Sequence, residues 1–202
     1  SALSTLAYLS NFWFLFEDSY LADASRLKPL LHTWSLAVEE QFYIMLPLFL
    51  FITTLKFKSK TNYIIATIIL ISFIYSVIGS LKFIDANFYL LPSRLWELLA
   101  GSLIARNEIN NKFRLSIFVN TLISVVGFIF ILGSIILIND TASHPSLITI
   151  FTVLGTVFIL ISGNKNHIIK RILSSKVLVG TGLISYSLYL WHFPILAFAR
   201  IK

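Results

Sequence analysis

The chain has 202 residues, of which 57% are hydrophobic and 12% charged, whereas a soluble domain carries about 25% charged residues. This composition excludes an ordinary soluble fold, because such a fold cannot hide so much apolar surface. The formal charge is +7, and the absence of cysteine excludes disulfides and thiolate metal sites.

Apolar residues fall into blocks of about 20 positions, the helix length needed to cross about 30 Å of hydrocarbon. Backbone polar groups in hydrocarbon must be satisfied internally, so each block is expected to be a helix. The sequence therefore predicts an all-α, polytopic transmembrane bundle in a single domain, 1–202. Its expected elements are a partial span at 1–16 and six complete spans at 34–55, 62–80, 88–106, 115–138, 145–162 and 178–198.

The first residues lie directly in an apolar run, Ala2 to Phe16, with no charged flank before it. This start is not typical of a signal peptide, and it predicts a fragment cut inside a helix. The end at Lys202 is similarly abrupt.

Basic residues gather in three alternate connections, 56–60, 106–114 and 163–177. They are Lys56, Lys58, Lys60, Arg106, Lys112, Arg114, Lys165, Lys170, Arg171 and Lys176. The other connections hold most of the loop acids, which are Glu17, Asp18, Asp23, Asp85 and Asp140, together with Arg26, Lys28, Lys82 and Arg94. Because short cytoplasmic loops accumulate Lys and Arg, the first set is predicted to be cytoplasmic and 17–33 external. The net charge is then a topology signal, and nucleic acid is not an expected partner.

Ionisable side chains within a span cost roughly 2.5–3.5 kcal/mol, so they point to function. The first such cluster contains His32, Thr33, Trp34, Ser35, Glu39, Glu40, Gln41 and Tyr43. At 100° per residue, Ser35, Glu39 and Tyr43 form one row, and Glu40 lies on the next. The two carboxylates therefore point in different directions. Either one lines a cavity while the other braces a helix, or both are structural ion-pair partners.

A second cluster surrounds Arg94 and Glu97, which share a helix face because they are three positions apart. Arg94 follows Pro92 by two residues. Pro92 suits a first helical turn. The pair is either a structural bridge, to each other or to Glu39 or Glu40, or a site at which Arg94 grips a phosphate or carboxylate of a substrate.

A third cluster places Ser185, Tyr189 and His192 along one helical face near Trp191. His192 is either a hydrogen-bonded anchor or part of a site. His144 and His167 are weaker candidates for functional residues. The spacing of the His and Glu residues fits no metal-ligand motif, so no metal is expected.

Together the three clusters resemble the acyltransferase-3 family of integral-membrane acyltransferases, which includes O-antigen and peptidoglycan O-acetyltransferases. The matching segments are His32–Leu36 running into Glu39–Tyr43, then Arg94–Leu98 with Gly101, then Ile184–His192. The resemblance implies transfer of an acyl group, commonly acetyl from cytoplasmic acetyl-CoA, to a hydroxyl of an envelope glycan such as lipopolysaccharide. It also implies a multi-pass protein of the bacterial inner membrane that needs no bound cofactor.

Family members begin with helices bearing an Arg and, about ten residues on, a catalytic His, and no such pair precedes Ser1. The resemblance thus implies that the principal base lies in a missing segment and that this fragment does not work alone. Glu39, Glu40 and His32 are then expected in supporting catalytic roles. The expected substrate-binding residues are Trp34, Ser35, Tyr43, Arg94, Glu97, Tyr189 and His192.

Two other function classes remain open. A transporter or flippase would use the same intramembrane charges to bind a passing substrate or proton, although no internal repeat favours it. A non-catalytic scaffold subunit would pair these charges only with one another.

Overall fold

The computed structural model describes residues 2–17, 27–57, 59–109, 116–137, 144–162 and 168–200, and these contain helices but no strand. The helices are α1 (Ala2–Leu6), α2 (Ser10–Glu17), α3 (Thr33–Phe57), α4 (Thr61–Lys82), α5 (Ile84–Tyr89), α6 (Leu91–Ile109), α7 (Ile117–Leu137), α8 (Thr149–Ser162), α9 (Ile168–Leu173) and α10 (Lys176–Arg200). The predicted all-α class is confirmed.

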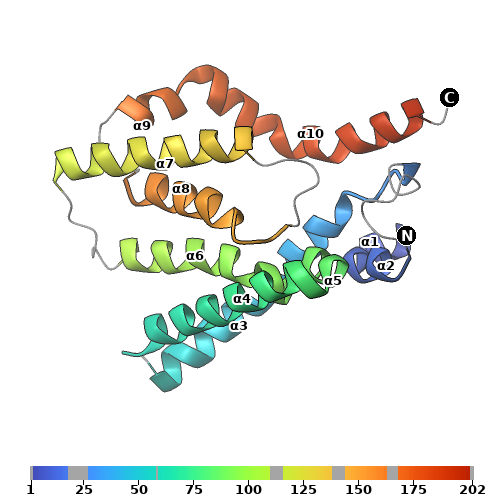
Figure 1. The fold of residues 1–202 in the computed structure, drawn as a ribbon, viewed down its shortest axis with the longest axis horizontal. Helices are drawn as coiled ribbons and strands as arrows, with labels where there is room; N and C mark the ends of the chain where they lie inside the picture. The colour runs from blue at the N-terminus through green and yellow to red at the C-terminus, as the bar shows by residue number, and fades with distance from the viewer. Residues whose placement is uncertain are drawn as a thin grey trace.

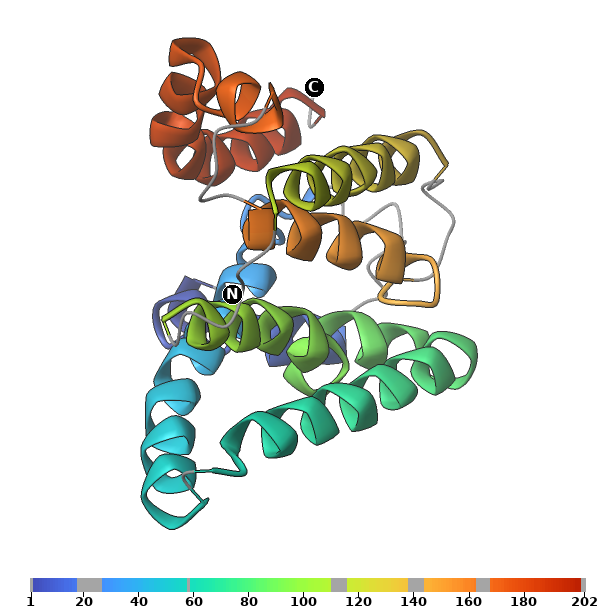
Figure 2. The same ribbon diagram turned by 90° about the vertical axis from the view of Figure 1, so that its left-hand side faces the viewer.

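The long helices form a stack in which α8 lies between α7 and α6, and α6 lies between α8 and α4 (Figures 1 and 2). Helix α3 packs against both α4 and α6, and the short helices α2 and α5 contact its first half. Helices α9 and α10 lie beyond α7 (Figure 2). This arrangement puts the start of α6 at the centre of the bundle.

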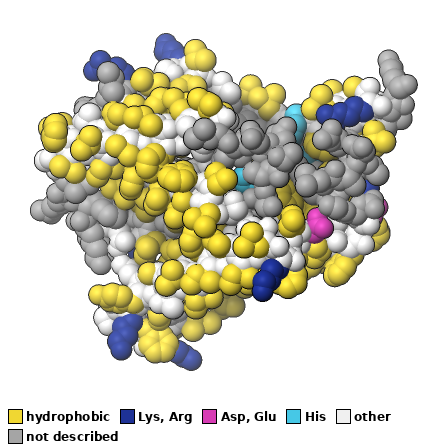
Figure 3. All heavy atoms as spheres, viewed as in Figure 1, with side chains coloured by type: hydrophobic (Ala, Val, Ile, Leu, Met, Phe, Trp, Pro, Cys, Tyr) yellow, Lys and Arg dark blue, Asp and Glu magenta, His cyan; other side chains and the backbone are white. Residues whose placement is uncertain are grey.

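Within the part of the chain that the structure describes, four helices are long and apolar enough to cross a membrane, namely α3, α4, α7 and α10. Apolar side chains also cover much of the described surface on the face seen in Figure 3. Helix α6 has 19 residues, roughly 28 Å of helix, but it carries Arg94, Glu97 and Arg106. Helix α8 has only 14 residues. The six predicted spans thus correspond to four strongly apolar helices, one charged helix and one short helix, in a membrane bundle.

Three predicted spans have different boundaries in the structure. The region 1–16 forms two short helices, because Tyr8 between them has φ 54°, a left-handed conformation that a helix cannot contain. Segment 88–106 is divided at Leu90, which has extended backbone between α5 and α6. Segment 145–162 becomes helical only at Thr149, whose hydroxyl accepts a hydrogen bond from the Ser146 amide at 2.7 Å within a preceding turn.

A serine from α4 shapes the first turn of α6. The Ser72 hydroxyl donates to the Pro92 carbonyl at 2.6 Å and accepts from the Trp96 amide at 3.0 Å. These are the two groups that an α-helix normally pairs with each other, so the hydroxyl bridges them across the turn that carries Arg94. Helix α4 therefore fixes the direction in which this turn presents its side chains.

The positions of the helix ends agree with the prediction that successive connections lie alternately at the two ends of the bundle. The end of α3 and start of α4, and the ends of α6 and α8, lie at one end of the molecule (Figure 1). The starts of α3, α6 and α8 lie at the other. Several residues that carried the charge argument lie outside the described residues, namely Asp18, Asp23, Arg26, Lys58, Lys112, Arg114, Asp140 and Lys165.

Candidate functional site

A cavity of about 90 Å³ lies between the first turns of α3 and α6. Its lining joins the first two clusters predicted from the sequence, and consists of Trp34, Ser35, Val38, Glu39, Arg94, Glu97 and Leu98. Residues about 60 positions apart in the sequence thus meet around one space that contains a cation and two carboxyl groups.

Arg94 is held on three sides. Its Nε donates to the Phe88 carbonyl at 2.9 Å, and its guanidinium carbon lies 4.6 Å from the ring centroid of Trp34 and 5.2 Å from that of Phe88. Its Nη1 is 4.0 Å from Glu97 Oε2, the outer limit of an ion pair. Because the ring faces and the carbonyl fix the guanidinium plane, Arg94 presents a positive charge of defined orientation to the cavity.

Glu97 also lines a second cavity, of about 220 Å³, between α6 and α8. The other lining residues are Leu98, Gly101, Thr152, Val153, Thr156, Val157 and Leu160. Within the described part of the chain, Glu97 Oε1 and Thr152 Oγ1 are buried without hydrogen-bond partners. A Cβ on Gly101 would meet no atom within 4 Å, so this wall is open. Buried unpaired oxygens beside a space of this size call for water or a ligand.

The adjacent acids of α3 have different surroundings. Glu39 lines the 90 Å³ cavity, and its charge interacts with those of Glu40 and Arg94. Glu40 is half-buried and does not line it. Tyr43 is 55% exposed, contacts the Phe42 ring and also lies outside the cavity. The structure thus brings Glu39, but not Glu40 or Tyr43, to the Arg94 site.

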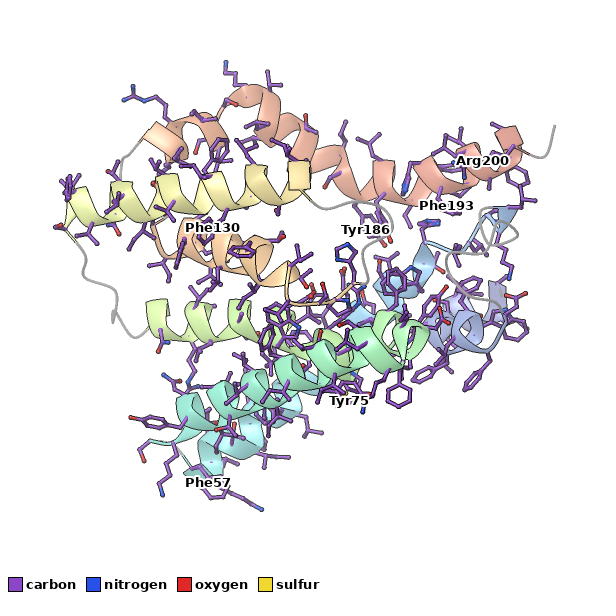
Figure 4. The ribbon with its side chains drawn as sticks, viewed as in Figure 1. Phe57, Tyr75, Phe130, Tyr186, Phe193 and Arg200 are labelled. Carbon is purple, nitrogen blue, oxygen red and sulfur yellow. The ribbon has the colours of Figure 1, made fainter. Side chains whose placement is uncertain are left out.

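The third cluster meets the start of α3 rather than the Arg94 cavity. The Tyr189 hydroxyl donates to the His32 carbonyl at 2.5 Å and lies 2.6 Å from Ser35 Oγ. Because Tyr189 has one hydroxyl proton, which goes to the carbonyl, Ser35 is the donor in the second bond. Phe193, on the side of α10 that faces α3 in Figure 4, stacks on the His32 ring at 5.5 Å.

His32 is buried at this junction, and neither ring nitrogen makes a hydrogen bond of normal geometry with the described residues. Burial lowers the pKa of His32, and the nearby charge of His192 lowers it further. Interactions of the ring with the carbonyls of Pro29 and Leu190 raise the pKa of His32, against this lowering. The Leu190 carbonyl is free of the usual helix hydrogen bond, because Pro194, four residues on, has no amide proton to donate to it.

His192 lies beside His32, with ring centroids 5.5 Å apart, and its Nδ1 is 2.6 Å from the Tyr189 carbonyl. Ser185, predicted on the same face, is exposed and donates to the Gly182 carbonyl. No group of three metal-ligating side chains occurs among the residues that the structure describes.

His144, one of the weaker candidates from the sequence, lies outside the lining of both cavities. It lies just before α8, is half-buried, and its charge interacts with that of Arg94. Burial lowers the pKa of His144, and Arg94 lowers it further. The available signal was a histidine next to proline in a predicted external loop. His167, the other weaker candidate, lies outside the described residues.

Comparison with known proteins agrees with the resemblance that the sequence motifs indicate. A family model described as an acyltransferase domain matches residues 2–201. The O-acetyltransferase OatA of Staphylococcus aureus strain NCTC 8325 / PS 47 is 30% identical over 214 residues, which is 98% of this chain and 35% of the relative. OatA of strain MRSA252 gives the same values. The chain thus spans about a third of the length of these curated relatives. No solved structure gives a significant match.

Proposed function

The chain belongs to the acyltransferase-3 family, and on that premise we propose that the whole protein transfers an acyl group, in the first place acetyl, to a hydroxyl of a cell-envelope glycan. The acceptor class is O-antigen or another surface polysaccharide, and the donor is acyl-CoA. Residues 1–202 form one acyltransferase domain within a multi-pass protein of the bacterial inner membrane. The named relatives, which are O-acetyltransferases, support the type of reaction.

The observation that carries this proposal is the cavity around Arg94, Glu39 and Glu97. Acyl transfer develops negative charge on the carbonyl oxygen of the acyl group, and fixed positive charge stabilises it best in a site that excludes water. Arg94 is such a charge, because Phe88 and Trp34 hold its guanidinium in place. In this proposal Glu39, which lines the same cavity, orients a catalytic imidazole, as a carboxylate does in Ser-His-Asp enzymes.

The α6–α8 cavity supports an approach of the donor from the other end of the bundle. It is lined on α8 from Thr152 to Leu160, roughly 12 Å of helix, and Glu97 belongs to both cavities. Leu160 is near the end of α8 at Ser162, on the side predicted to face the cytoplasm. An acyl thioester entering there would reach the wall that Glu97 shares with the Arg94 site.

The remaining predicted residues take supporting roles in this proposal. His32 serves acceptor-side chemistry at the external end, and Glu40 braces a helix that neighbours α3. Trp34, Ser35, Tyr43, Tyr189 and His192 contribute to substrate binding, with Trp34 and Ser35 in the cavity wall and Tyr189 and His192 at the α3–α10 junction.

The test uses membranes that contain the full-length protein and radiolabelled acetyl-CoA, with label on surface glycan as the readout. The variant is Glu39→Gln, and the matched control is Glu17→Gln. Glu17 is exposed, and its contacts with Lys28 and with the Trp13 indole lie at the surface. Transfer by the wild type and the control, with a loss of at least tenfold in Glu39→Gln, is expected. Label uptake without covalent transfer would instead establish a transporter.

A further inference from the structure

The cavity between α6 and α8 is lined by one face of each helix, and both helices start at the same end of the molecule (Figure 1). On α8 the lining residues recur at the spacing of one helix face, and they are Thr152, Val153, Thr156, Val157 and Leu160. Leu160 is 49% exposed and Thr156 is exposed, whereas Thr152 is half-buried. The cavity is therefore open toward the end of α8 and enclosed toward its start.

Two threonines of α8 line this cavity, and their hydroxyl groups differ. Thr156 Oγ1 donates to the Thr152 carbonyl at 3.0 Å, the usual bond of a helix threonine to the carbonyl four residues before it. Thr152 Oγ1 is buried and makes no hydrogen bond with any described residue. Because a buried hydroxyl without a partner costs free energy, Thr152 is expected to bond with a molecule in the cavity.

Glu97 supplies a second unpaired oxygen. Its Oε2 lies 4.0 Å from Arg94 Nη1, whereas its Oε1 is buried and has no partner in the described part of the chain. A carboxylate oxygen accepts hydrogen bonds, and a threonine hydroxyl can donate one. The lining thus offers an acceptor and a donor in an otherwise apolar space. A lipid hydrocarbon chain satisfies neither oxygen, whereas a secondary amide carries both an N–H and a carbonyl.

Gly101 leaves the α6 wall of the cavity without a side chain. A Cβ at this position would meet no atom within 4 Å, so the glycine is not needed for close packing of helices. Its effect is to keep space open about one helical turn from Glu97. Because Glu97 lines the Arg94 cavity as well, a chain that passes Gly101 reaches the proposed reaction site.

We propose that the α6–α8 cavity binds the pantetheine arm of the acyl-CoA donor, with Thr152 and Glu97 as its hydrogen-bond partners. This inference rests on the proposed acyl transfer. Pantetheine is a narrow, extended chain with two secondary amides, which matches a largely apolar cavity that offers a donor and an acceptor. The arm passes Gly101, and its thioester end lies at the wall shared with Arg94. The nucleotide lies beyond Leu160, at the end predicted to face the cytoplasm.

The first experiment measures kcat and the KM for acetyl-CoA in label transfer by the full-length protein in membranes. Thr152→Val removes only the hydroxyl, so the lost hydrogen bond should raise the KM about 2- to 12-fold and leave kcat unchanged. Gly101→Leu should raise the KM by about tenfold or more, because a side chain then occupies the space of the arm.

Two matched controls lie outside the cavity. Thr67→Val changes an exposed threonine of α4 whose hydroxyl is bonded to the Tyr63 carbonyl. Gly133→Leu changes a glycine of α7 whose Cβ would also meet no atom within 4 Å. Both should keep the wild-type KM. S-acetyl-pantetheine keeps the arm but lacks the nucleotide, so Thr152→Val should raise the KM for it by the same factor as for acetyl-CoA.

The second experiment measures binding without transfer. In the full-length protein, with any other cysteines replaced by serine, the Gly101→Cys thiol is modified by a small methanethiosulfonate reagent. Coenzyme A should slow this modification by about fivefold or more, because the arm covers position 101. Adenosine 3′,5′-bisphosphate, which lacks the arm, should not slow it.

The outcomes separate the assigned site from the proposed function. If the wild type transfers no label while coenzyme A protects the thiol, the proposed function fails and the binding site stands. If the wild type transfers label and the KM is unchanged in Thr152→Val and in Gly101→Leu, the binding site is wrong. Absence of protection by coenzyme A would assign the cavity to lipid, and equal protection by the bisphosphate would place the nucleotide there. Either result overturns the proposal.

Discussion

Gly127 of α7 and Gly155 of α8 face each other where these two helices pack together. A Cβ on Gly127 would lie 2.7 Å from the Gly155 carbonyl oxygen, and a Cβ on Gly155 would lie 2.8 Å from that of Gly127. Small residues allow such an approach between membrane helices, where packing replaces the hydrophobic effect as the source of association. Because α8 also forms one wall of the Glu97 cavity, this glycine pair positions that wall.

Gly127→Ala is therefore expected to destabilise the protein by about 1–3 kcal/mol, since the new methyl group forces the helices apart. The matched control is Gly133→Ala in the same helix, where a Cβ meets no atom within 4 Å. There alanine should be neutral, or stabilise by up to about 1 kcal/mol through its better helix propensity. Thermal unfolding in detergent distinguishes them, and equal melting temperatures would contradict the close approach.

Tyr189→Phe should weaken the attachment of α10 to α3. The variant loses the hydrogen bonds to the His32 carbonyl and to Ser35, each worth about 0.5–1.5 kcal/mol. The control is Tyr186→Phe, because Tyr186 on the same helix is 63% exposed (Figure 4). The measurement is the rate at which a protease cleaves folded protein within 168–200. Unchanged cleavage in Tyr189→Phe would show that these bonds do not hold α10.

The helices themselves were largely predictable from the sequence, because the length of an apolar block is set by the bilayer. The approximate positions of α3, α4, α7 and α10 follow from that constraint alone. The break at Leu90 and the short α8 were not predicted, since Ser72, Thr149 and their partners act through contacts that hydropathy does not register.

The site was predictable in part. The cost of charge in a membrane singled out Glu39, Arg94 and Glu97, and helical periodicity separated Glu39 from Glu40. That α3 and α6 share one cavity depends on helix packing, which no single segment encodes. His144 carried no such signal, because a histidine in a polar connection costs nothing. Its charge interaction with Arg94 depends on how the segment before α8 packs on the bundle, which no local sequence pattern encodes.

The stability of the protein should fall as the pH drops below about 6.5, the ordinary pKa of histidine. Burial and then the charge of His192 lower the pKa of His32 in the fold, so the unfolded chain binds more protons below that pH. Stability is then full above about pH 6.5 and is lost as the pH falls toward the lowered pKa.

His32→Phe should reduce this acid sensitivity, and it removes two buried nitrogens that lack hydrogen bonds. The readout is the difference in melting temperature between pH 7.5 and pH 5.5. A smaller difference in the variant than in the wild type and in His167→Gln is expected. An equal difference would assign the acid sensitivity to other groups, such as His144, whose pKa burial and Arg94 also lower.

The two ends of α4 are predicted to face opposite sides of the membrane, since its 22 residues extend roughly 33 Å. The chain has no cysteine, so Lys60→Cys and Lys82→Cys each introduce a single exposed thiol within it. In intact cells, with cysteines elsewhere in the full-length protein replaced by serine, a membrane-impermeant maleimide should label Cys at position 82. It should label position 60 only after permeabilisation. The reverse pattern would invert the predicted topology.

Arg94→Lys should lower acyl transfer by about 10²- to 10³-fold, although it keeps the charge. A lysine ammonium cannot stack on Trp34 while donating in a fixed plane to the Phe88 carbonyl, so its position in the cavity is no longer defined. The control is Arg200→Lys, at the exposed end of α10, which should transfer label at the wild-type rate. If Arg94→Lys retained full transfer with an unchanged KM, the positive charge alone would suffice. The orientation imposed by Phe88 and Trp34 would then have no part in catalysis.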